Sequence, residues 1–579
     1  MQARTLRVQS GDISLAVNCY GTASKPVLLL VHGYPDSSSV WDKVVPLLVK
    51  HFHVVTYDVR GAGQSDAPQR LGEYQLRYLM QDTFAVIDAV SPNRPVHLVG
   101  HDWGSIQCWE AVTEPGADKR IASYTTVSGP SLDHVGHWFR ERFSSLTPAA
   151  VLSAAGQLAH SWYIFMFQLP WLAPTLWQNG LGKAWPKVLE NLEGIDADIN
   201  PTQTRDGALG VNLYRANMFP RLLRPRQRVA QVPVQMIVAQ KDNYVTPGML
   251  RQLEDWMPQL WRRELNVSHW LQQSHPQQFA DYLIDFVQHI EGAPETPSLR
   301  RARRDGDSRE FSGKLVVVTG AGSGIGRETA IAFALEGAEV ICADINEEAV
   351  QETVSMLPLG KAHAATVDVS DARAMETFAH HVEATFGAPD IIVNNAGIGM
   401  AGRFLDTSSK DWEKVLGVNL WGVIHGCRLF GKQMVKAARA GHIVNVASAA
   451  AWTPSRAYPA YATSKAAVLM LSECLQAELA DDGIGVTAVC PGVIDTGITL
   501  ATHFVGVEDD EQARRRQAVK NLYQRRAYTP DRVAAAIVDA VRENTAVAVV
   551  SPEAHGLRWL SRLAPGVMRR MARLDMTPQ

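Results

Sequence analysis

An aspartate, Asp102, lies between a strand-like apolar run and a glycine-flanked turn, in the segment LVGHDWG (98–104). Serine is the usual residue at such a nucleophile elbow, a strained strand-to-helix turn that exposes its central side chain. A carboxylate there would attack an electrophilic carbon and form an ester that water can cleave, which suits epoxides or alkyl halides better than amides. The motif alone is weak, and an ordinary turn aspartate is the alternative interpretation.

Two more groups follow in the order nucleophile, acid, base that this chemistry requires. Asp242 comes after the strand-like run 234–239, and His269 lies at the end of a later strand-like run. His269 would take a proton from water, and Asp242 would hold its imidazole in the right tautomer. The backbone N–H groups of Tyr34 and Trp103 would supply an oxyanion hole.

From about residue 11 to residue 289 the chain resembles epoxide hydrolases of the α/β-hydrolase fold. The similarity rests on four segments: HGYP at 32–35, RGAGQSDAP at 60–68, GHDWGS at 100–105 and SHW at 268–270. It implies that two tyrosines, Tyr163 and Tyr214, hydrogen-bond the epoxide oxygen, because an alkoxide leaves poorly at neutral pH without a proton donor. Tyr34 departs from the Trp or Phe common at its position in the family, which bears on substrate fit more than on mechanism.

Two other interpretations of the first half stay open. Haloalkane dehalogenases share the fold and the aspartate, and Trp103 would suit a halide-binding role, but they do not need two tyrosine acids. The first half is alternatively a catalytically idle binding module that holds the substrate of the second half. The complete set of nucleophile, acid, base, oxyanion loop and tyrosine pair argues against an idle module.

A second set of residues begins at the glycine-rich segment TGAGSGIG (319–326), which joins the buried-strand run 314–318 to a helical segment. Strand, glycine turn and helix N-terminus form a cradle for a pyrophosphate, because the glycines allow close approach and the helix dipole favours an anion. The residues of this turn that we expect to bind the cofactor are Gly320, Ser323, Gly324, Ile325 and Gly326.

The choice of cofactor is predicted from Asp344, which ends the next strand-like run, 339–343. A carboxylate there accepts hydrogen bonds from a ribose 2′-hydroxyl and repels a 2′-phosphate, so NAD is expected in preference to NADP. A solvated acid at a strand end is the alternative interpretation of Asp344.

Tyr461 is the only one of the 14 tyrosines with a lysine, Lys465, four residues later. On a helix this spacing places phenol and ammonium on one face. The lysine charge favours the phenolate, so Tyr461 would exchange a proton with a substrate hydroxyl or carbonyl near neutral pH. Ser448, after the strand-like run 443–446, would hydrogen-bond the same substrate oxygen.

From residue 313 to about residue 550 the chain resembles the short-chain dehydrogenases of the SDR superfamily. Besides TGAGSGIG, Ser448 and YATSK, the family pattern includes NNAG at 394–397, Asn419 in VNLWG, and Pro491-Gly492 followed by Thr496. The resemblance implies that Asn419 supports a proton-relay water and that Lys465 also binds the nicotinamide ribose. The other cofactor contacts it implies are Asp368 and Val369 at the adenine, with Asn395, Ala396, Gly397, Pro491, Gly492 and Thr496.

These residues need two α/β scaffolds, since both halves alternate strand-like and helix-like runs and so predict parallel sheets flanked by helices. The fold class expected is an N-terminal α/β-hydrolase fold with a helical cap, and a C-terminal Rossmann-type doubly wound parallel sheet. The cap is the aromatic, helix-like stretch at about 131–222, whose aromatic side chains mostly pack its own core.

The 579 residues exceed what one core can hold. We expect a hydrolase domain at 1–291, a linker at 292–311 and a dehydrogenase domain at 312–579. The linker segment is rich in proline, glycine and charge, and its arginine cluster favours solvation over an anionic partner.

The amino-acid composition limits the classes of binding partner that we expect. A net charge of −3 gives no reason to expect nucleic acid, and the six dispersed cysteines show neither a CxxC pair nor metal-ligand spacing, so no metal is expected. The N-terminus lacks the apolar core of a signal peptide and no run is long enough to span a bilayer, which favours a cytoplasmic protein. We expect a small hydrophobic substrate, and a homo-oligomer formed through the dehydrogenase domain.

The C-terminal segment 555–573 interleaves five arginines with apolar residues. Such a basic amphipathic helix would rest on the inner face of an anionic membrane, or pack across a dehydrogenase oligomer. Fusion of the two halves suggests that they act in sequence. The first half would open an epoxide to a vicinal diol, and the second would oxidise a secondary hydroxyl of that diol. The alternative is that the two halves act on separate substrates.

Overall fold

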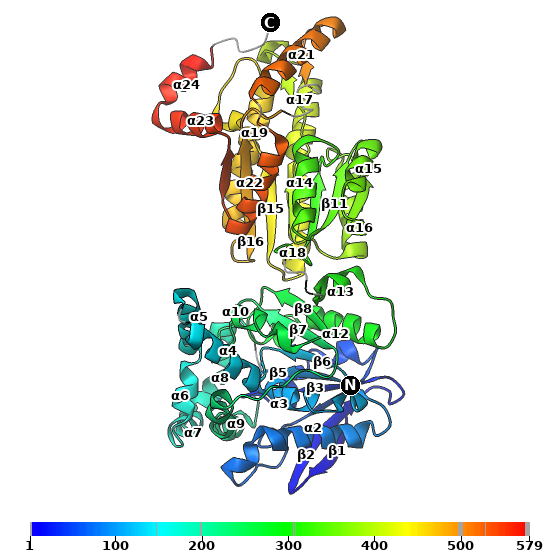
Figure 1. The fold of residues 1–579 in the computed structure, drawn as a ribbon, viewed down its shortest axis with the longest axis vertical. Helices are drawn as coiled ribbons and strands as arrows, with labels where there is room; N and C mark the ends of the chain where they lie inside the picture. The colour runs from blue at the N-terminus through cyan, green and yellow to red at the C-terminus, as the bar shows by residue number, and fades with distance from the viewer. Residues whose placement is uncertain are drawn as a thin grey trace. The chain divides into compact units, whose positions relative to one another are not determined.

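A computed structural model describes residues 3–145, 147–196, 200–304, 306, 309–495, 502–526 and 528–573. The chain divides into two compact units, 1–305 and 306–579, each with its own sheet (Figure 1). The expected fold class is confirmed, with an α/β-hydrolase fold in the first unit and a Rossmann-type sheet in the second.

The first unit contains a nine-stranded sheet in the order β1-β2-β4-β3-β5-β6-β7-β8-β9. The central strands, β3 to β8, are parallel, and their nearly continuous Val, Leu and Ile side chains are buried, as expected for a sheet covered on both faces. The strands are β1 (Arg4–Ser10), β2 (Ile13–Tyr20), β3 (Val27–Val31), β4 (His53–Tyr57), β5 (Val96–His101), β6 (Ile121–Val127), β7 (Val234–Ala239), β8 (Leu260–Leu265) and β9 (Arg303–Arg304).

Two groups of helices surround this sheet. Those next to the strands are α1 (Val45–Leu48), α2 (Leu76–Val90), α3 (Trp103–Val112), α10 (Pro247–Arg251), α11 (Leu271–Ser274), α12 (Pro276–Ile290) and α13 (Pro297–Ala302). The cap, inserted between β6 and β7, gathers on one side of the unit (Figure 1, cyan to green). Its helices are α4 (Leu132–Ser145), α5 (Pro148–His160), α6 (Trp162–Phe167), α7 (Leu172–Leu176), α8 (Gly182–Glu193) and α9 (Gln203–Leu223).

The segment expected as a linker, 292–311, is partly built into the first unit. Helix α13 buries Leu299 and Ala302 against Trp261 and Phe286, and β9 pairs antiparallel with β8. Thr296 caps the helix by accepting a hydrogen bond from the Leu299 N–H at 3.1 Å. A short apolar stripe within a polar stretch is therefore enough to dock this part of the segment.

The second unit contains a seven-stranded parallel sheet in the order β12-β11-β10-β13-β15-β16-β18, the doubly wound order of dinucleotide-binding folds. Its strands are β10 (Leu315–Thr319), β11 (Glu339–Asp344), β12 (Ala362–Thr366), β13 (Ile391–Asn394), β15 (Gly441–Val446), β16 (Ile484–Pro491) and β18 (Val547–Val550). A separate pair joins β14 (Met400–Ala401) to β17 (His503–Phe504).

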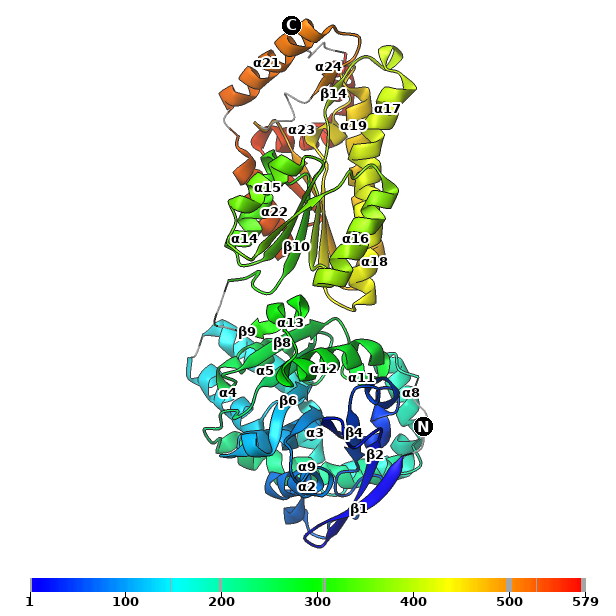
Figure 2. The same cartoon turned by 90° about the vertical axis from the view of Figure 1, so that its right-hand side faces the viewer.

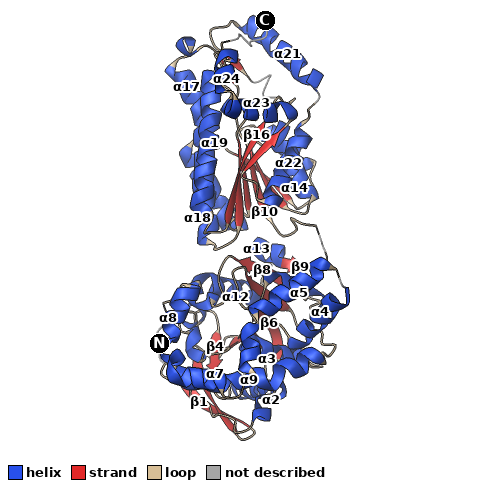
Figure 3. Cartoon of the chain, turned by 90° about the vertical axis from the view of Figure 1, so that its left-hand side faces the viewer, coloured by secondary structure: helices blue, strands red, loops and turns tan. Residues whose placement is uncertain are grey.

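Helices cover both faces of this sheet (Figures 2 and 3). One face carries α14 (Gly324–Leu335), α15 (Glu347–Ser355) and α22 (Pro530–Glu543), and the other carries α16 (Ala372–Phe386), α18 (Gly422–Lys436) and α19 (Pro459–Leu479). The remaining helices of this unit are α17 (Ser409–Leu416), α21 (Asp509–Arg526), α23 (Pro552–Leu563) and α24 (Pro565–Met571).

The C-terminal helices pack on their own unit. Helix α23 contacts the 3-10 turn η8 (Ala449–Trp452), where the Arg558 guanidinium lies 5.7 Å from the centre of the Trp452 ring. The Arg456 N–H donates to the carbonyl of Ala572 at 3.2 Å, beyond the end of α24. Searched over the described residues, no helix is long and apolar enough to cross a membrane.

Candidate active sites

Asp102 sits at the sharp turn between β5 and α3 with φ 50°, a backbone conformation that side chains rarely adopt. The space around the turn explains the glycines of the motif. A Cβ at Gly104 would collide with the carbonyls of Val31 and His32, and one at Gly33 would lie 2.5 Å from the Asp102 side chain. The strained, glycine-lined elbow predicted for Asp102 is therefore present.

The two N–H groups expected to form an oxyanion hole both hydrogen-bond the Asp102 carboxylate. The Tyr34 N–H donates to Oδ1 at 2.7 Å, and the Trp103 N–H donates as well. Burial raises the pKa of Asp102 to about 6, although the His269 charge and these two hydrogen bonds oppose the rise. Asp102 is thus ionised at neutral pH, and its Oδ1 atom accepts from the Tyr34 N–H, one of the two groups expected to form the oxyanion hole.

His269 bridges the two aspartates. Its Nδ1 lies 3.0 Å from Asp242 Oδ2, and its Nε2 lies 3.8 Å from Asp102 Oδ2. Burial alone would lower the pKa of His269, but the charges of Asp242 and Asp102 and the Asp242 hydrogen bond outweigh it and raise the pKa to about 9. His269 lies in the loop after β8, which ends at Leu265, and not at the end of the strand itself.

Asp242 is held by its own loop. The N–H groups of Tyr244 and Val245 donate to its Oδ1 at 2.8 and 3.0 Å. Burial acts to raise the pKa of Asp242, yet the charge of His269 and the hydrogen bonds from His269, Ser128 and Val245 bring it below its ordinary value. Asp242 therefore stays charged while it orients His269.

The two cap tyrosines lie together beside the nucleophile. Tyr163 in α6 and Tyr214 in α9 have ring centres 5.9 Å apart and a hydrogen bond between their side chains. The Tyr214 ring lies 4.8 Å from the Trp103 ring, whose indole also hydrogen-bonds the Tyr214 hydroxyl. Burial and the Asp102 charge raise the pKa of both phenols, so both remain protonated donors.

The side chain of Tyr34 is held by hydrogen bonds to residues of the cap. Its hydroxyl donates to the Gly207 carbonyl at 3.0 Å and accepts a hydrogen bond from the Trp177 indole at 2.7 Å. Its ring lies 5.4 Å from that of Tyr214. The position that departs from the family pattern therefore joins the oxyanion loop to the cap.

Sequence reasoning missed Glu193, the last residue of α8 in the cap. Its Oε2 accepts a hydrogen bond from the backbone N–H of His269 at 3.0 Å. Its Oε1 is buried and has no hydrogen-bond partner among the described residues. The Glu193 charge also raises the pKa of His269. Nothing in the sequence around Glu193 signals this contact, which joins segments 76 residues apart.

In the second unit, the glycine turn joins β10 to α14, with Ser323 at the helix N-cap position and Ile325 in the first turn. Gly320 has φ 65° and Gly324 has φ 53°, and a Cβ at Gly326 would collide with the Gly320 carbonyl. The turn leaves space only for backbone, which fits the close approach of a pyrophosphate.

The NNAG segment closes one side of this turn. The Asn395 amide donates to the carbonyls of Thr319 and Gly320 at 3.0 and 3.1 Å, and the Ala396 N–H donates to the Thr319 hydroxyl at 3.2 Å. Gly397 follows, next to Asn419 and Lys465. The structure thus gathers the predicted cofactor residues of three separate motifs.

Asp344, at the carboxyl end of β11, points toward the glycine turn. Its Oδ2 accepts from the Gly322 N–H at 2.8 Å and its Oδ1 from the Asn346 N–H at 2.9 Å. Asp368 and Val369 follow β12, the neighbouring strand, at the same edge of the sheet. Asp368 accepts a hydrogen bond from the Ser370 hydroxyl at 2.7 Å, and Val369 is buried.

Tyr461 and Lys465 share one face of α19, with the lysine Nζ 5.9 Å from the centre of the phenol ring. Burial lowers the pKa of Lys465 to about 8, and its Nζ donates to the Val446 carbonyl at 2.8 Å. Ser448 follows β15 at the start of η8, which packs on α19. The predicted proximity of phenol and ammonium is present.

Asn419 lies in a π-helical turn, η7 (Gly417–Trp421), before α18. Its Oδ1 accepts from the Ile398 N–H at 2.8 Å, and its Nδ2 donates to the Ile398 carbonyl at 3.0 Å and to the Ser464 hydroxyl at 3.2 Å. These contacts fix a π-bulge beside the segment that contains Tyr461, as is frequent at functional sites.

Pro491 ends β16, and Gly492 follows it, against Ser551 and Glu553. Thr496 lies outside the described residues. Glu553, in the first turn of α23, accepts a hydrogen bond from the Val493 N–H at 3.0 Å. The start of the C-terminal tail therefore holds the loop that contains this motif, a contact that the sequence analysis did not foresee.

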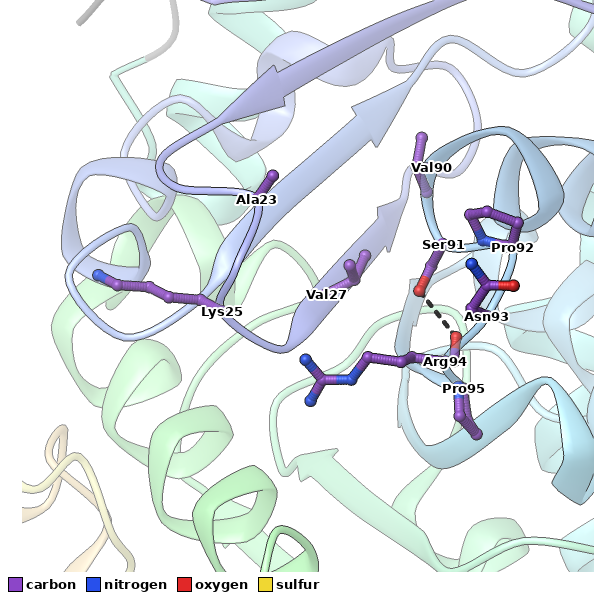
Figure 4. A pocket seen from close by; sticks show the side chains of 9 residues that line it. All are labelled: Ala23, Lys25, Val27, Val90, Ser91, Pro92, Asn93, Arg94 and Pro95. Carbon is purple, nitrogen blue, oxygen red and sulfur yellow. Dashed lines mark hydrogen bonds between the residues drawn. The ribbon is translucent and has the colours of Figure 1, made fainter.

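A surface hollow in the first unit is lined by Ala23, Lys25, Val27 and residues 90–95 (Figure 4). It lies at the amino end of β3, whereas Asp102 and its partners lie at the carboxyl ends of the strands. Within the described parts of the chain, no cluster of His, Cys, Asp and Glu is arranged to hold a metal ion.

Comparison with known proteins gives a relative for the whole chain and others for its parts. A family model described as "alpha/beta hydrolase fold" matches residues 26–276, and one described as "short chain dehydrogenase" matches residues 314–503. The chain is 44% identical to "Probable oxidoreductase EphD" of Mycobacterium tuberculosis and Mycobacterium bovis, over 98% of both chains.

Two further proteins resemble the second half only. Meso-2,3-butanediol dehydrogenase of Serratia marcescens is 36% identical over 33% of this chain and 74% of its own. A solved short chain dehydrogenase/reductase of Burkholderia phymatum, in complex with NAD, is 30% identical over 47% of this chain and 99% of its own, with a TM-score of 0.42.

Proposed function

This chain belongs to the family of proteins that fuse an α/β-hydrolase-fold domain to a short-chain dehydrogenase domain, with the mycobacterial EphD oxidoreductases, and from that premise we propose two activities. The first unit hydrolyses an epoxide to a vicinal diol. The second oxidises an alcohol or reduces a carbonyl with NAD. The observation that supports the first activity most is the Asp102 carboxylate, anchored by Tyr34 at 2.7 Å, facing His269 and two protonated tyrosines.

In the first step, Asp102 Oδ2 attacks an epoxide carbon and forms an ester bond. The carbon–oxygen bond of the ring breaks, and its electron pair goes to the epoxide oxygen. Tyr163 or Tyr214 donates a proton to that oxygen, so a hydroxyl leaves and not an alkoxide. Oδ1 remains hydrogen-bonded to Tyr34 throughout and becomes the ester carbonyl oxygen.

In the second step, His269 removes a proton from water, and the water oxygen attacks the ester carbonyl carbon. Negative charge develops on Oδ1, which already accepts the Tyr34 N–H at 2.7 Å, and the Trp103 N–H also donates to this carboxylate. The intermediate then expels the second hydroxyl of the diol, which takes the proton from His269. Asp102 is left as a carboxylic acid that holds the other proton of the water. Transfer of that proton to the deprotonated tyrosine, directly or through solvent, restores both the Asp102 carboxylate and the tyrosine hydroxyl.

An epoxide is the better candidate than an alkyl halide for one structural reason. The indole of Trp103, which a halide ion would need as a donor, hydrogen-bonds the Tyr214 hydroxyl. This contact aligns Tyr214 for proton donation and occupies the donor.

In the second unit, Tyr461 exchanges a proton with the substrate oxygen, and Ser448 hydrogen-bonds the same oxygen. Lys465 is buried beside the phenol, so its charge favours the deprotonated form of Tyr461. An added Cβ at Gly320, Gly322 or Gly326 would lie within 3.0 Å of neighbouring atoms, so the turn keeps a bare backbone at these positions, which fits the close approach of a dinucleotide. NAD bound there would accept or supply the hydride.

The preference for NAD is proposed from Asp344. Replacement Asp344→Asn keeps acceptor and size but removes the charge that repels a 2′-phosphate, whereas Asp344→Ala also releases the Gly322 N–H. We expect NADP affinity to rise in both variants and the NAD affinity to fall mainly in Asp344→Ala. Equal affinities of the unaltered protein for NAD and NADP would contradict the assignment.

Product analysis tests both activities at once. Short and long-chain epoxides are incubated with the full chain, with and without NAD, and the products are identified by mass spectrometry. We expect diol formation without NAD, and with NAD a carbonyl product two mass units below the diol. A His269→Gln variant should accumulate an ester on the Asp102 peptide, and the absence of that adduct would instead support a binding module.

A further inference from the structure

Residues 147–182, which contain the cap helices α5, α6 and α7, include no Asp, Glu, Lys or Arg. A solvated surface of this length normally contains charges, since they keep folded proteins apart. The three helices follow one another, α5 contacts α6 and α6 contacts α7. Figure 1 shows them on the outer side of the first unit, away from its strands.

This uncharged segment, its helices and the turn between α6 and α7, exposes large apolar side chains. Trp162 is 64% exposed, Trp171 66% and Leu152 72%, with Phe165, Leu169 and Leu176 also exposed. We call these six side chains the cap patch. Scattered apolar residues on a surface are ordinary, but a contiguous uncharged segment that exposes this many marks a contact surface.

We propose that the cap patch docks the hydrolase unit on a lipid surface that contains anionic headgroups. Tryptophan and phenylalanine are the side chains preferred at the boundary between headgroups and acyl chains. Lys183 and Lys187, exposed at the start of α8 directly after the uncharged segment, have no acidic partner within the described residues and are placed to meet anionic headgroups. If two copies of the chain paired through their cap patches, both lysines would face the uncharged segment 147–182 of the other copy, which contains no Asp or Glu to pair with them.

The patch and the proposed hydrolase site lie on opposite faces of the same helices. In α6, Trp162 and Phe165 point to solvent, while Tyr163 between them lies with its ring 5.8 Å from Tyr244. In α5, which exposes Leu152, Gln157 is buried and hydrogen-bonds the loop that holds Asp242, with its Nε2 2.9 Å from the Tyr244 carbonyl. A lipid surface held by the patch is therefore one helix diameter from the site.

The docking itself does not depend on which reaction the unit performs. The link to substrate rests on the proposed function, because an epoxide within an acyl chain would partition into the surface on which the cap lies. The vesicle assay below therefore uses no substrate.

Co-sedimentation of the full chain with vesicles tests the proposal. The vesicles are phosphatidylcholine alone, or phosphatidylcholine with phosphatidylglycerol. We expect binding to both, tighter to the anionic vesicles, and the extra affinity should be lost in K183Q/K187Q. The triple variant W162Q/F165Q/W171Q should lower the partition coefficient roughly tenfold or more, because three buried aromatic side chains are removed from the interface.

The matched control replaces three exposed apolar side chains of the C-terminal helices, in W559Q/L563Q/V567Q, and should bind vesicles as the unaltered chain does. Failure of the unaltered chain to bind, unchanged binding by the cap variant, or loss of binding in the tail control would each overturn the proposal. So would a dimer in analytical ultracentrifugation that the cap variant dissociates, because a second copy would then cover the patch.

A water-soluble epoxide separates this inference from the proposed function. The cap variant should hydrolyse that epoxide as fast as the unaltered chain, which also shows that it is folded. If neither hydrolyses it while vesicle binding follows the predicted pattern, the proposed hydrolysis fails and the docking surface stands.

Discussion

At the residue scale, the charge of Asp102 changes during the proposed reaction, and the base responds to it. His269 has a pKa of about 9 partly because Asp102 is ionised beside it. Ester formation removes that charge, so the pKa of His269 falls and the share of neutral imidazole, the form needed to activate water, increases.

This coupling gives a measurable shift. In Asp102→Asn, the pKa of His269 measured by NMR should lie below that of the unaltered protein, and Asp242→Asn should lower it further. Formation of the ester should rise as the pH passes about 6, where Asp102 ionises. A His269 pKa that is the same with and without the Asp102 charge would show that the two groups do not interact.

Glu193 is predicted to act as a positioning residue for His269. Glu193→Ala leaves the buried backbone N–H of His269 without its acceptor, which should destabilise the fold by about 1–3 kcal/mol and, because the imidazole is then less well positioned, lower kcat. Glu193→Gln retains an acceptor and should restore most of the rate.

The pH profile distinguishes positioning from a simple packing role. Both variants remove a charge that raises the pKa of His269. The rise in kcat that accompanies deprotonation of His269 should therefore occur at a lower pH in each variant. A packing defect would lower the rate in Glu193→Ala and leave that step where it was.

At the element scale, the sequence predicted the local motifs better than the contacts between distant elements. The glycine turn, the elbow at Asp102 and the spacing of Tyr461 and Lys465 follow from rules that act within a few residues, and each appears in the structure. The contact of Glu193 with His269 depends on how the cap settles over the sheet. No local pattern determines that packing.

The C-terminal segment shows the same limit. Its arginines and apolar residues predicted an amphipathic helix, and the structure contains α23 and α24 interrupted at Pro565. The sequence analysis left two alternatives for its partner, a membrane or a dehydrogenase oligomer, and both stay predictions, whereas contacts within its own unit were not foreseen. Glu553 and Arg558 contact the loops after β16 and β15, which a helical pattern alone does not reveal.

The glycine turn provides a prediction at this scale. A methyl group in Gly326→Ala meets the Gly320 carbonyl and the Asn395 amide, so the turn must shift. We expect a destabilisation of about 1–3 kcal/mol and at least a tenfold loss of NAD affinity, measured by thermal unfolding and by titration calorimetry.

Gly556→Ala in α23 is the matched control, since an added Cβ meets no atom within 4 Å there. It should leave NAD affinity unchanged and increase stability slightly, because alanine is the better helix former. Unchanged NAD affinity in Gly326→Ala would show that the turn does not cradle the cofactor.

At the scale of the whole molecule, the two halves have separate sheets and separate apolar cores. The fold class was predicted from alternating strand and helix patterns, and the family from ordered motifs, because both kinds of signal accumulate along a long chain. The packing of α13 within the expected linker was not predicted. This helix has only six residues and buries one leucine, Leu299, which is too weak a periodic signal to recognise in the sequence.

Separate cores predict separable activities. Asp102→Asn should abolish diol formation and leave NAD reduction with a supplied diol unchanged, and Tyr461→Phe should do the reverse. Rates of both reactions measured on each full-length variant check this. Loss of both activities in either variant would show that the halves act as one unit.

The hydrogen bond from Tyr34 to Asp102 makes the two carboxylate oxygens unequal, and this has an isotopic consequence. In heavy-oxygen water, the first diol formed should contain an ordinary oxygen taken from Oδ2, and the heavy atom should enter the carboxylate on the side of His269. The next turnover passes that atom to the diol. If Tyr34 prevents rotation of the carboxylate, Asp102 should contain one heavy oxygen after many turnovers and never two. The number of heavy atoms would then show that Oδ1, the oxygen bound by Tyr34, is never exchanged with water.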